Sequence, residues 1–331
     1  MKEGFLSAIS DFSGSLVEKS YTVMDNRKIK WSVLALLILA AVLLPLFVND
    51  RWLNVIWYAF FYMLLAMGLN IIVGYCGLCD LGFAAKFAIG AYTTGILMKT
   101  FGWSFWLTLP VSVGVSIVAA CVIGGPALRL RSDYLAIVTI GFSEIVRITA
   151  RNLKITGAAS GLSGIQRPYI LGMQLKDVSQ WYYTFLILVV LFIVVSHRLK
   201  NSRFGRALQY IREDEDAAQA MGVNTTLYKL FAFIVGTVMG GLAGSFYTVR
   251  MTAISPNSFQ FTLSANVLLA VVLGGMGKTP GVLLGAAFLA VFPELFRDVK
   301  YVSDARMLFF GILLIFVMIN RPQGLWPERK R

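Results

Sequence analysis

Long blocks of apolar residues, separated by short polar stretches, make up most of this chain. The blocks do not alternate apolar and polar residues, as the strands of a membrane β-barrel do. The pattern therefore predicts an all-α, polytopic helical membrane protein with about ten membrane segments. These ten segments are 31–48, 52–73, 83–98, 105–126, 134–151, 182–197, 229–249, 263–277, 281–296 and 306–320.

Several of these blocks are shorter than the roughly 20 residues that a straight membrane-spanning helix needs. Segments 263–277 and 281–296 are also separated only by a glycine-rich turn. Broken or re-entrant segments are tolerated in a membrane where their backbone is buried in protein. We therefore expect eight to ten complete crossings.

The composition supports a membrane protein. Hydrophobic residues make up 57% of the chain and charged residues only 14%, with a mean hydropathy of +0.72. A soluble domain has about half apolar and a quarter charged residues. The net charge of +13 would suggest nucleic-acid binding in a soluble protein. In a membrane protein, basic residues gather in cytoplasmic loops instead, so we expect no nucleic-acid partner.

The basic residues also predict the orientation. With the N-terminus placed in the cytoplasm, the inner loops hold about twice as many Lys and Arg residues as the outer loops. Both termini are therefore expected in the cytoplasm. We divide the chain into a cytoplasmic tail (1–30), a transmembrane domain (31–327) and a short C-terminal tail (328–331).

The N-terminal tail contains four apolar residues that would share one face of a helix. Their spacings of four, three and four residues are helical. The tail is either a short helix in the membrane interface or an unstructured segment. The four residues are Phe5, Ile9, Phe12 and Leu16.

The longest internal polar segment, 198–228, is expected on the cytoplasmic side between two membrane helices. Its alanines and glutamates favour helix, and Gly222 suits a helix C-terminus. Such a helix can contact only the cytosol or a partner protein. The alternative is a solvated loop that does no more than help to set the topology.

Four ionisable residues lie within apolar blocks: Lys86, Glu144, Arg147 and, near the end of its block, Arg151. A charge near the centre of a membrane costs at least about 2.5 kcal/mol, so these side chains should face protein or water. Glu144 and Arg147 are three residues apart and can share one helix face. They form either a structural ion pair or part of a substrate route. Lys86 is expected to pair with Glu144, to reach the membrane surface or to attract a substrate carboxylate.

The sequence offers no metal or cofactor site. Cys76 and Cys79 form a C-x-x-C pair, but His197 is the only histidine. Residues 274–279 resemble the end of a phosphate-binding loop, yet Val272 stands where the pattern needs its first glycine. We therefore expect no cofactor, no metal and no ATP hydrolysis by this chain.

Six motifs resemble, in order, those of the second permease subunit of branched-chain amino-acid importers of the ATP-binding-cassette type. The resemblance covers about residues 31–327. The motifs are GYCGLCDLGFAAKFAIGAY (74–92), LRLRSDYLAIVTIGFSEIVRI (128–148), SPNSFQF (255–261), VVLGGMGKTPG (271–281), PELFR (293–297) and RPQGLWP (321–327).

This resemblance implies a function and a set of partners. The chain would be a permease, not an enzyme, in the bacterial cytoplasmic (inner) membrane, contacting lipid. It would import branched-chain or related amino acids together with a homologous second permease, two cytoplasmic ATPase subunits and an extracytoplasmic binding protein. The family usually has an apolar residue at the place of Lys86.

The resemblance also assigns segment 198–228 to docking of the ATPases. The alternative function is a self-sufficient secondary transporter, for which Glu144 would be the candidate ion site. The residues expected to couple the permease to the ATPases are Arg203, Gly205, Arg206, Glu215, Ala217, Ala218 and Gly222.

Overall fold

The computed structural model describes residues 41–295, except 129, 131, 171 and 172, together with 311 and 324. The chain divides into two compact units, 1–53 and 54–331. The expected interfacial helix, most of segments 31–48 and 306–320, and the C-terminal tail lie outside the described residues. In the first unit, a 3-10 helix η1 (Leu44–Leu46) precedes the start of helix α3.

The eight predicted segments from 52–73 to 281–296 are helical. Within the described residues, four helices are long and apolar enough to cross a membrane: α3 with its extension, α5, α7 and α10. The eight segments correspond to α3 (Asp50–Leu69) with the π-helix η2 (Asn70–Tyr75), α4 (Phe83–Phe101), α5 (Phe105–Ala127), α6 (Ser132–Asn152), α7 (Val178–Asn201), α10 (Thr225–Met251), α11 (Phe261–Gly274) and α12 (Thr279–Leu295).

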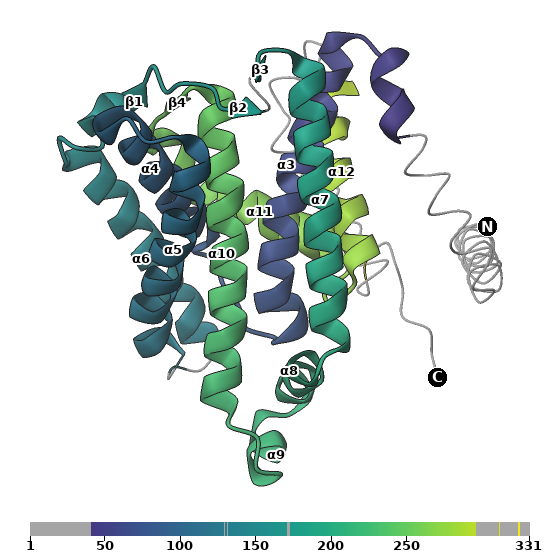
Figure 1. Ribbon diagram of the computed structural model, residues 1–331. Coiled ribbons are helices and arrows are strands. Elements are labelled where there is room, and N and C mark those ends of the chain that lie inside the picture. The colour runs from purple at the N-terminus through teal and green to yellow at the C-terminus, as the bar shows by residue number, and fades with distance from the viewer. Residues whose placement is uncertain are drawn as a thin grey trace. The chain divides into compact units, whose positions relative to one another are not determined.

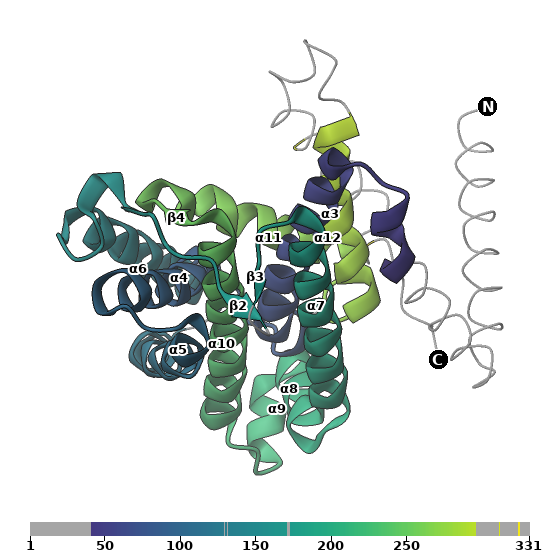
Figure 2. The same ribbon diagram turned by 45° about the horizontal axis from the view of Figure 1, so that its top comes forward.

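Helix α10 lies between α4, α5 and the end of α3, as Figures 1 and 2 show. Its glycines allow this close packing. A Cβ atom on Gly236 would lie 2.5 Å from Ile72 Cδ1, and one on Gly244 would collide with the carbonyl of Phe87. In lipid, hydrophobic burial gives no net driving force for helix association. Small residues instead let helix backbones approach closely. The glycine-rich face of α10 is thus a packing surface.

The two ends of this bundle differ. At one end, two short helices connect α7 to α10: α8 (Arg203–Glu213) and α9 (Glu215–Ala220). The other end carries two antiparallel ladders of two-residue strands, β1 with β4 and β2 with β3 (Figure 1). The elements at that end are η3 (Ala158–Ser160), β1 (Leu162–Ser163), β2 (Tyr169–Ile170), β3 (Met173–Gln174), β4 (Ala253–Ile254) and η4 (Pro256–Phe259).

Candidate functional site

The segment between α7 and α10 begins with a sharp turn. The Ser202 side chain accepts the Gly205 N–H at 3.1 Å and so caps the N-terminus of α8. A Cβ atom on Gly205 would lie 2.7 Å from the carbonyl carbon of Lys200, so only glycine fits there. Gly205 is buried and therefore lets α8 turn back closely against the end of α7.

Helix α8 is strongly amphipathic, with Leu208 and Ile211 buried against the bundle. Arg203 and Arg206 are exposed on the other face. Arg206 donates from Nη1 to the carbonyl of Asn201 at 3.0 Å. The apolar face fixes α8 to the membrane domain, while two predicted coupling residues remain open to a partner.

The prediction of a single helix that ends at Gly222 is wrong, because the helix is interrupted at Asp214. Asp214 has extended backbone (φ −155°, ψ 110°), and its carboxylate accepts the Ala217 N–H at 2.9 Å. An aspartate in this geometry starts a new helix, which is α9. Gly222 does end that helix, as predicted. Its φ of +84° is left-handed, and the N–H groups of Gly222 and Val223 return to carbonyls of α9.

The two alanines of α9 have different surroundings. Ala218 is 5% exposed and packs inside its own chain, whereas Ala217 is exposed. Of the two predicted coupling alanines, only Ala217 is therefore on the exposed surface of this chain. Met221, at the end of α9, is 85% exposed and adds apolar surface beside the predicted coupling residues.

Two contacts fix this segment to α10. The Glu215 carboxylate forms an ion pair with Lys229, whose side chain is 8% exposed. The ring of Phe204 stacks on Phe231, with ring centroids 4.6 Å apart. Glu215 thus holds α9 to α10 from its position at the edge of the exposed surface. The segment from 203 to 222 is a packed two-helix element and not a flexible loop.

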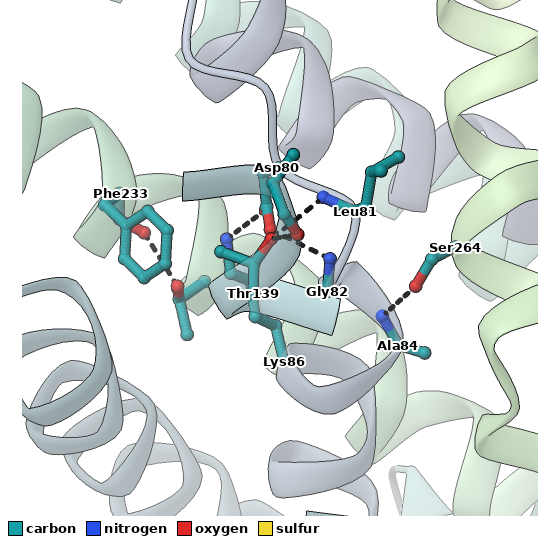
Figure 3. Close-up of polar contacts among 10 residues, drawn as sticks. Asp80, Leu81, Gly82, Ala84, Lys86, Thr139, Phe233 and Ser264 are labelled. Atoms are coloured by element: carbon teal, nitrogen blue, oxygen red, sulfur yellow. Dashed lines mark hydrogen bonds and ion pairs between the residues drawn. The ribbon is translucent and has the colours of Figure 1, made fainter. Parts of the chain in front are cut away.

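A second charged cluster lies at the start of α4, and Figure 3 shows it. Lys86 forms an ion pair with Asp80, and both residues are almost completely buried. Asp80 also accepts the Gly82 N–H at 3.1 Å, and the Lys86 ammonium lies 3.6 Å from the centre of the Phe233 ring. Lys86 therefore does not pair with Glu144. Asp80 was not predicted as the partner of Lys86, because it lies in a loop outside the apolar blocks.

The same loop is fixed by hydroxyl groups from other helices (Figure 3). Ser264 of α11 accepts the Ala84 N–H at 2.8 Å, and Thr139 of α6 accepts the Leu81 N–H at 3.2 Å. Helix N-termini leave backbone N–H groups without partners, and these hydroxyls satisfy them. The loop and the start of α4 are therefore held by hydroxyl groups of two other helices, α6 and α11, and by the Asp80–Lys86 ion pair.

The third cluster, Glu144 with Arg147, lies on the outward face of α6. The Arg147 guanidinium contacts both carboxylate oxygens, with Nε at 3.0 Å from each. The Glu144 side chain is 43% exposed and that of Arg147 is 16% exposed. We call this surface the α6 face: Ile137, Gly141, Glu144, Ile145, Arg147 and Ile148.

The rest of the α6 face is open. Its three isoleucines are exposed, and a Cβ atom on Gly141 would meet nothing within 4 Å. The predicted ion pair is confirmed, but it is not internal to the described part of the chain. A paired charge halfway along a predicted membrane segment then needs protein or water on its open side.

The family model for the branched-chain amino acid transport system permease component matches residues 51–318. The chain belongs to this family.

Its relatives in the family are described as permease proteins of transport systems. LivM proteins of Salmonella typhimurium and Escherichia coli, named high-affinity branched-chain amino acid transport system permease proteins, are 40% identical over 91% of this chain and 75% of their own length. The permease protein LivH of Escherichia coli is 24% identical over 80% of this chain and 90% of its own length. No solved structure matches the chain.

This membership makes the chain a multi-pass membrane transport component and not an enzyme. LivM and LivH are both similar to it, in agreement with a homologous partner permease. For such a permease component, the structure separates the predicted site residues into three places. The coupling residues share one segment, Lys86 is sealed beside Asp80, and Glu144 and Arg147 lie on the open α6 face.

Proposed function

We propose that this chain is a permease subunit of an ATP-binding-cassette importer for branched-chain or related amino acids. The 40% identity to LivM over most of the chain carries the proposal. The proposed assembly contains a homologous permease, two cytoplasmic ATPase subunits and an extracytoplasmic binding protein. It lies in the bacterial inner membrane, with eight to ten crossings and both termini in the cytoplasm.

In this assembly, segment 198–228 faces the cytoplasm, and the exposed surface of α8 and α9 contacts an ATPase. Arg203, Arg206 and Ala217 are exposed there, and Met221 adds an apolar group. Exposed charges at such an interface set orientation more than affinity. Gly205, Glu215, Ala218 and Gly222 act differently, because they shape the segment and fix it to α7 and α10.

The α6 face is the proposed substrate route, shared with the partner permease. Glu144 and Arg147 present opposite charges on an otherwise apolar surface. Opposite charges suit the carboxylate and ammonium of an amino acid, and the neighbouring isoleucines suit an aliphatic side chain. Lys86 contributes only indirectly, since it is sealed beside Asp80.

The experiment compares Ala217→Arg with Ala159→Arg, which adds the same charge at an exposed alanine at the other end of the bundle. The permease pair is purified from membranes with the ATPases, and uptake of labelled leucine is measured. Ala217→Arg should insert normally but lose the ATPases and uptake, because a long cation replaces a small side chain in the interface. Ala159→Arg should keep the ATPases.

Normal co-purification and parental uptake by Ala217→Arg would remove α9 from the coupling surface. Uptake that persists in vesicles without any ATPase subunit would favour the secondary transporter instead.

A further inference from the structure

One residue in the turn between α11 and α12 is held by two other elements. The Gly277 N–H donates to Asn70 Oδ1 of the π-helix η2 at 2.8 Å. The Gly277 carbonyl accepts from Lys200 Nζ, at the end of α7, at 2.9 Å. Gly277 has a φ of +82°, which favours glycine. Both hydrogen-bonding groups of a single turn residue are therefore committed to distant parts of the chain.

Arg212 of α8 reaches the same place. Its guanidinium donates to the carbonyl of Gly74 in η2. A Cβ atom on Gly277 would lie 2.8 Å from Arg212 Nη1, and one on Gly74 would lie 2.5 Å from the Gly277 nitrogen. The backbones of the π-helix and the turn are thus in close contact beside Arg212. Any side chain at either glycine would push them apart.

A second set of buried contacts supports the first. The Tyr75 hydroxyl lies 2.8 Å from Ser196 Oγ of α7 and 3.0 Å from Thr279 Oγ1 at the start of α12. The Lys200 ammonium lies 5.9 Å from the centre of the Tyr75 ring. These contacts join the same elements as the two hydrogen bonds of Gly277. The end of α7, η2 and the turn therefore form one unit.

Two features suit this junction to a movable contact. The Asn70 side chain is completely buried, yet among the described residues its Nδ2 has no hydrogen-bond partner. Leaving a buried donor unpaired costs about 1–3 kcal/mol, so the observed arrangement is not the most favourable one for this amide. In addition, α3 ends in the π-helix η2, and π-helical geometry is frequent at functional sites.

We propose that Arg212 and Lys200 are positioning residues of a latch that carries movement of α8 to η2 and the α11–α12 turn. We call it the Gly277 latch: Arg212, Lys200, Asn70, Gly74 and Gly277. It rests on the proposed coupling function and specifies how the signal enters the membrane domain. Charge-assisted hydrogen bonds to backbone carbonyls are strong and directional, so displacement of α8 pulls on the backbone of η2 directly.

The test uses the complete importer in lipid vesicles, with ATP hydrolysis and uptake of labelled leucine measured together. Arg212→Gln removes the charge that holds Gly74, whereas the control Arg198→Gln removes an exposed charge from the last turn of α7. Arg212→Gln should keep its ATPases and hydrolyse ATP at near the parental rate. Its leucine uptake per ATP should fall about 5- to 150-fold, the usual range for coupling between sites.

Arg198→Gln should keep the parental ratio of uptake to hydrolysis. A purely structural Arg212 would instead lower the amount of assembled importer and leave this ratio unchanged. An unchanged ratio for Arg212→Gln would therefore overturn the latch.

A second measurement decides the question even if Arg212→Gln does not assemble. Hydrogen exchange of residues 273–282 is followed in the parental importer, without nucleotide and with trapped nucleotide. The latch requires exchange at this turn to change between the two states, because Gly277 N–H changes its environment. Identical exchange in both states would overturn it. Failure of the parental chain to bind any ATPase would instead overturn the proposed function together with the latch.

Discussion

Two ion pairs of the described residues, Lys86–Asp80 and Glu144–Arg147, have opposite surroundings. The Lys86–Asp80 pair is sealed among α4, α10 and the loop before α4, with an aromatic ring over the ammonium. The Glu144–Arg147 pair lies within one turn of α6, on a face that the described chain leaves open. A sealed pair has all its partners within its own chain and serves the fold. An open pair in a predicted membrane segment needs a partner subunit or water to cover it.

The largest effect is expected from breaking the sealed pair. Asp80→Ala leaves the Lys86 ammonium buried without a counter-ion, which costs about 3–5 kcal/mol. The variant should be nearly absent from membranes, or unfold at a much lower temperature in detergent.

The matched control is the double variant Asp80→Ala with Lys86→Met, because replacing a buried pair with apolar groups is often neutral. It should regain most of the parental unfolding temperature. Parental stability of Asp80→Ala alone would show that the pair is not sealed.

An intermediate effect, on transport and not on folding, is expected from the open pair. Glu144→Gln should cost the isolated subunit about 0–1 kcal/mol, the usual value of an exposed pair. Leucine uptake by the importer should fall about tenfold, which corresponds to about 1.4 kcal/mol of lost interaction free energy. Thermal unfolding of the subunit and uptake by the complex measure the two quantities separately.

The double variant Glu144→Gln with Arg147→Gln sharpens this test. If the pair lines the substrate route, removing both charges does not restore uptake. Restored uptake in the double variant would mean that the two side chains only neutralise each other.

The smallest effect is expected on the chemical reactivity of a cysteine thiol near the sealed pair. Cys76 lies four residues before Asp80, and burial raises the pKa of its thiol to about 12. Only the thiolate reacts with alkylating reagents, so modification should be slow at pH 7 and rise about tenfold per pH unit below the pKa. Modification by N-ethylmaleimide is followed in a Cys79→Ser, Cys121→Ser variant. Rapid modification at pH 7 would show that water reaches this loop.

The helices of the bundle were predictable because each follows an apolar block of the sequence. The helix boundaries agree with the blocks within a few residues wherever the structure describes them. The π-helical turn at the end of α3 was not predictable, since Asn70–Tyr75 reads as ordinary apolar helix. It depends on a tertiary contact, the hydrogen bond between Asn70 and the Gly277 turn.

The site was predictable only in part. Spacing alone placed Glu144 and Arg147 together, since residues three apart on a helix are neighbours. The partner of Lys86 was missed, although a carboxylate six residues upstream of a helical lysine was a usable signal. The break at Asp214 was also readable, because aspartate followed by acidic residues favours a helix N-terminus. No local pattern connects Arg212 with Gly74, which lies far away in the sequence.

The short ladder between β1 and β4 has a mechanical consequence. It pairs Leu162 with Ile254 and Ser163 with Ala253, and so pins the chain after α6 to the chain directly after α10. The Ile165 N–H adds a bond to the Thr252 carbonyl at 3.1 Å. Because the two segments are paired, neither can slide past the other without breaking these hydrogen bonds. Any displacement of the C-terminal end of α10 must therefore carry the chain after α6 with it or break these pairs.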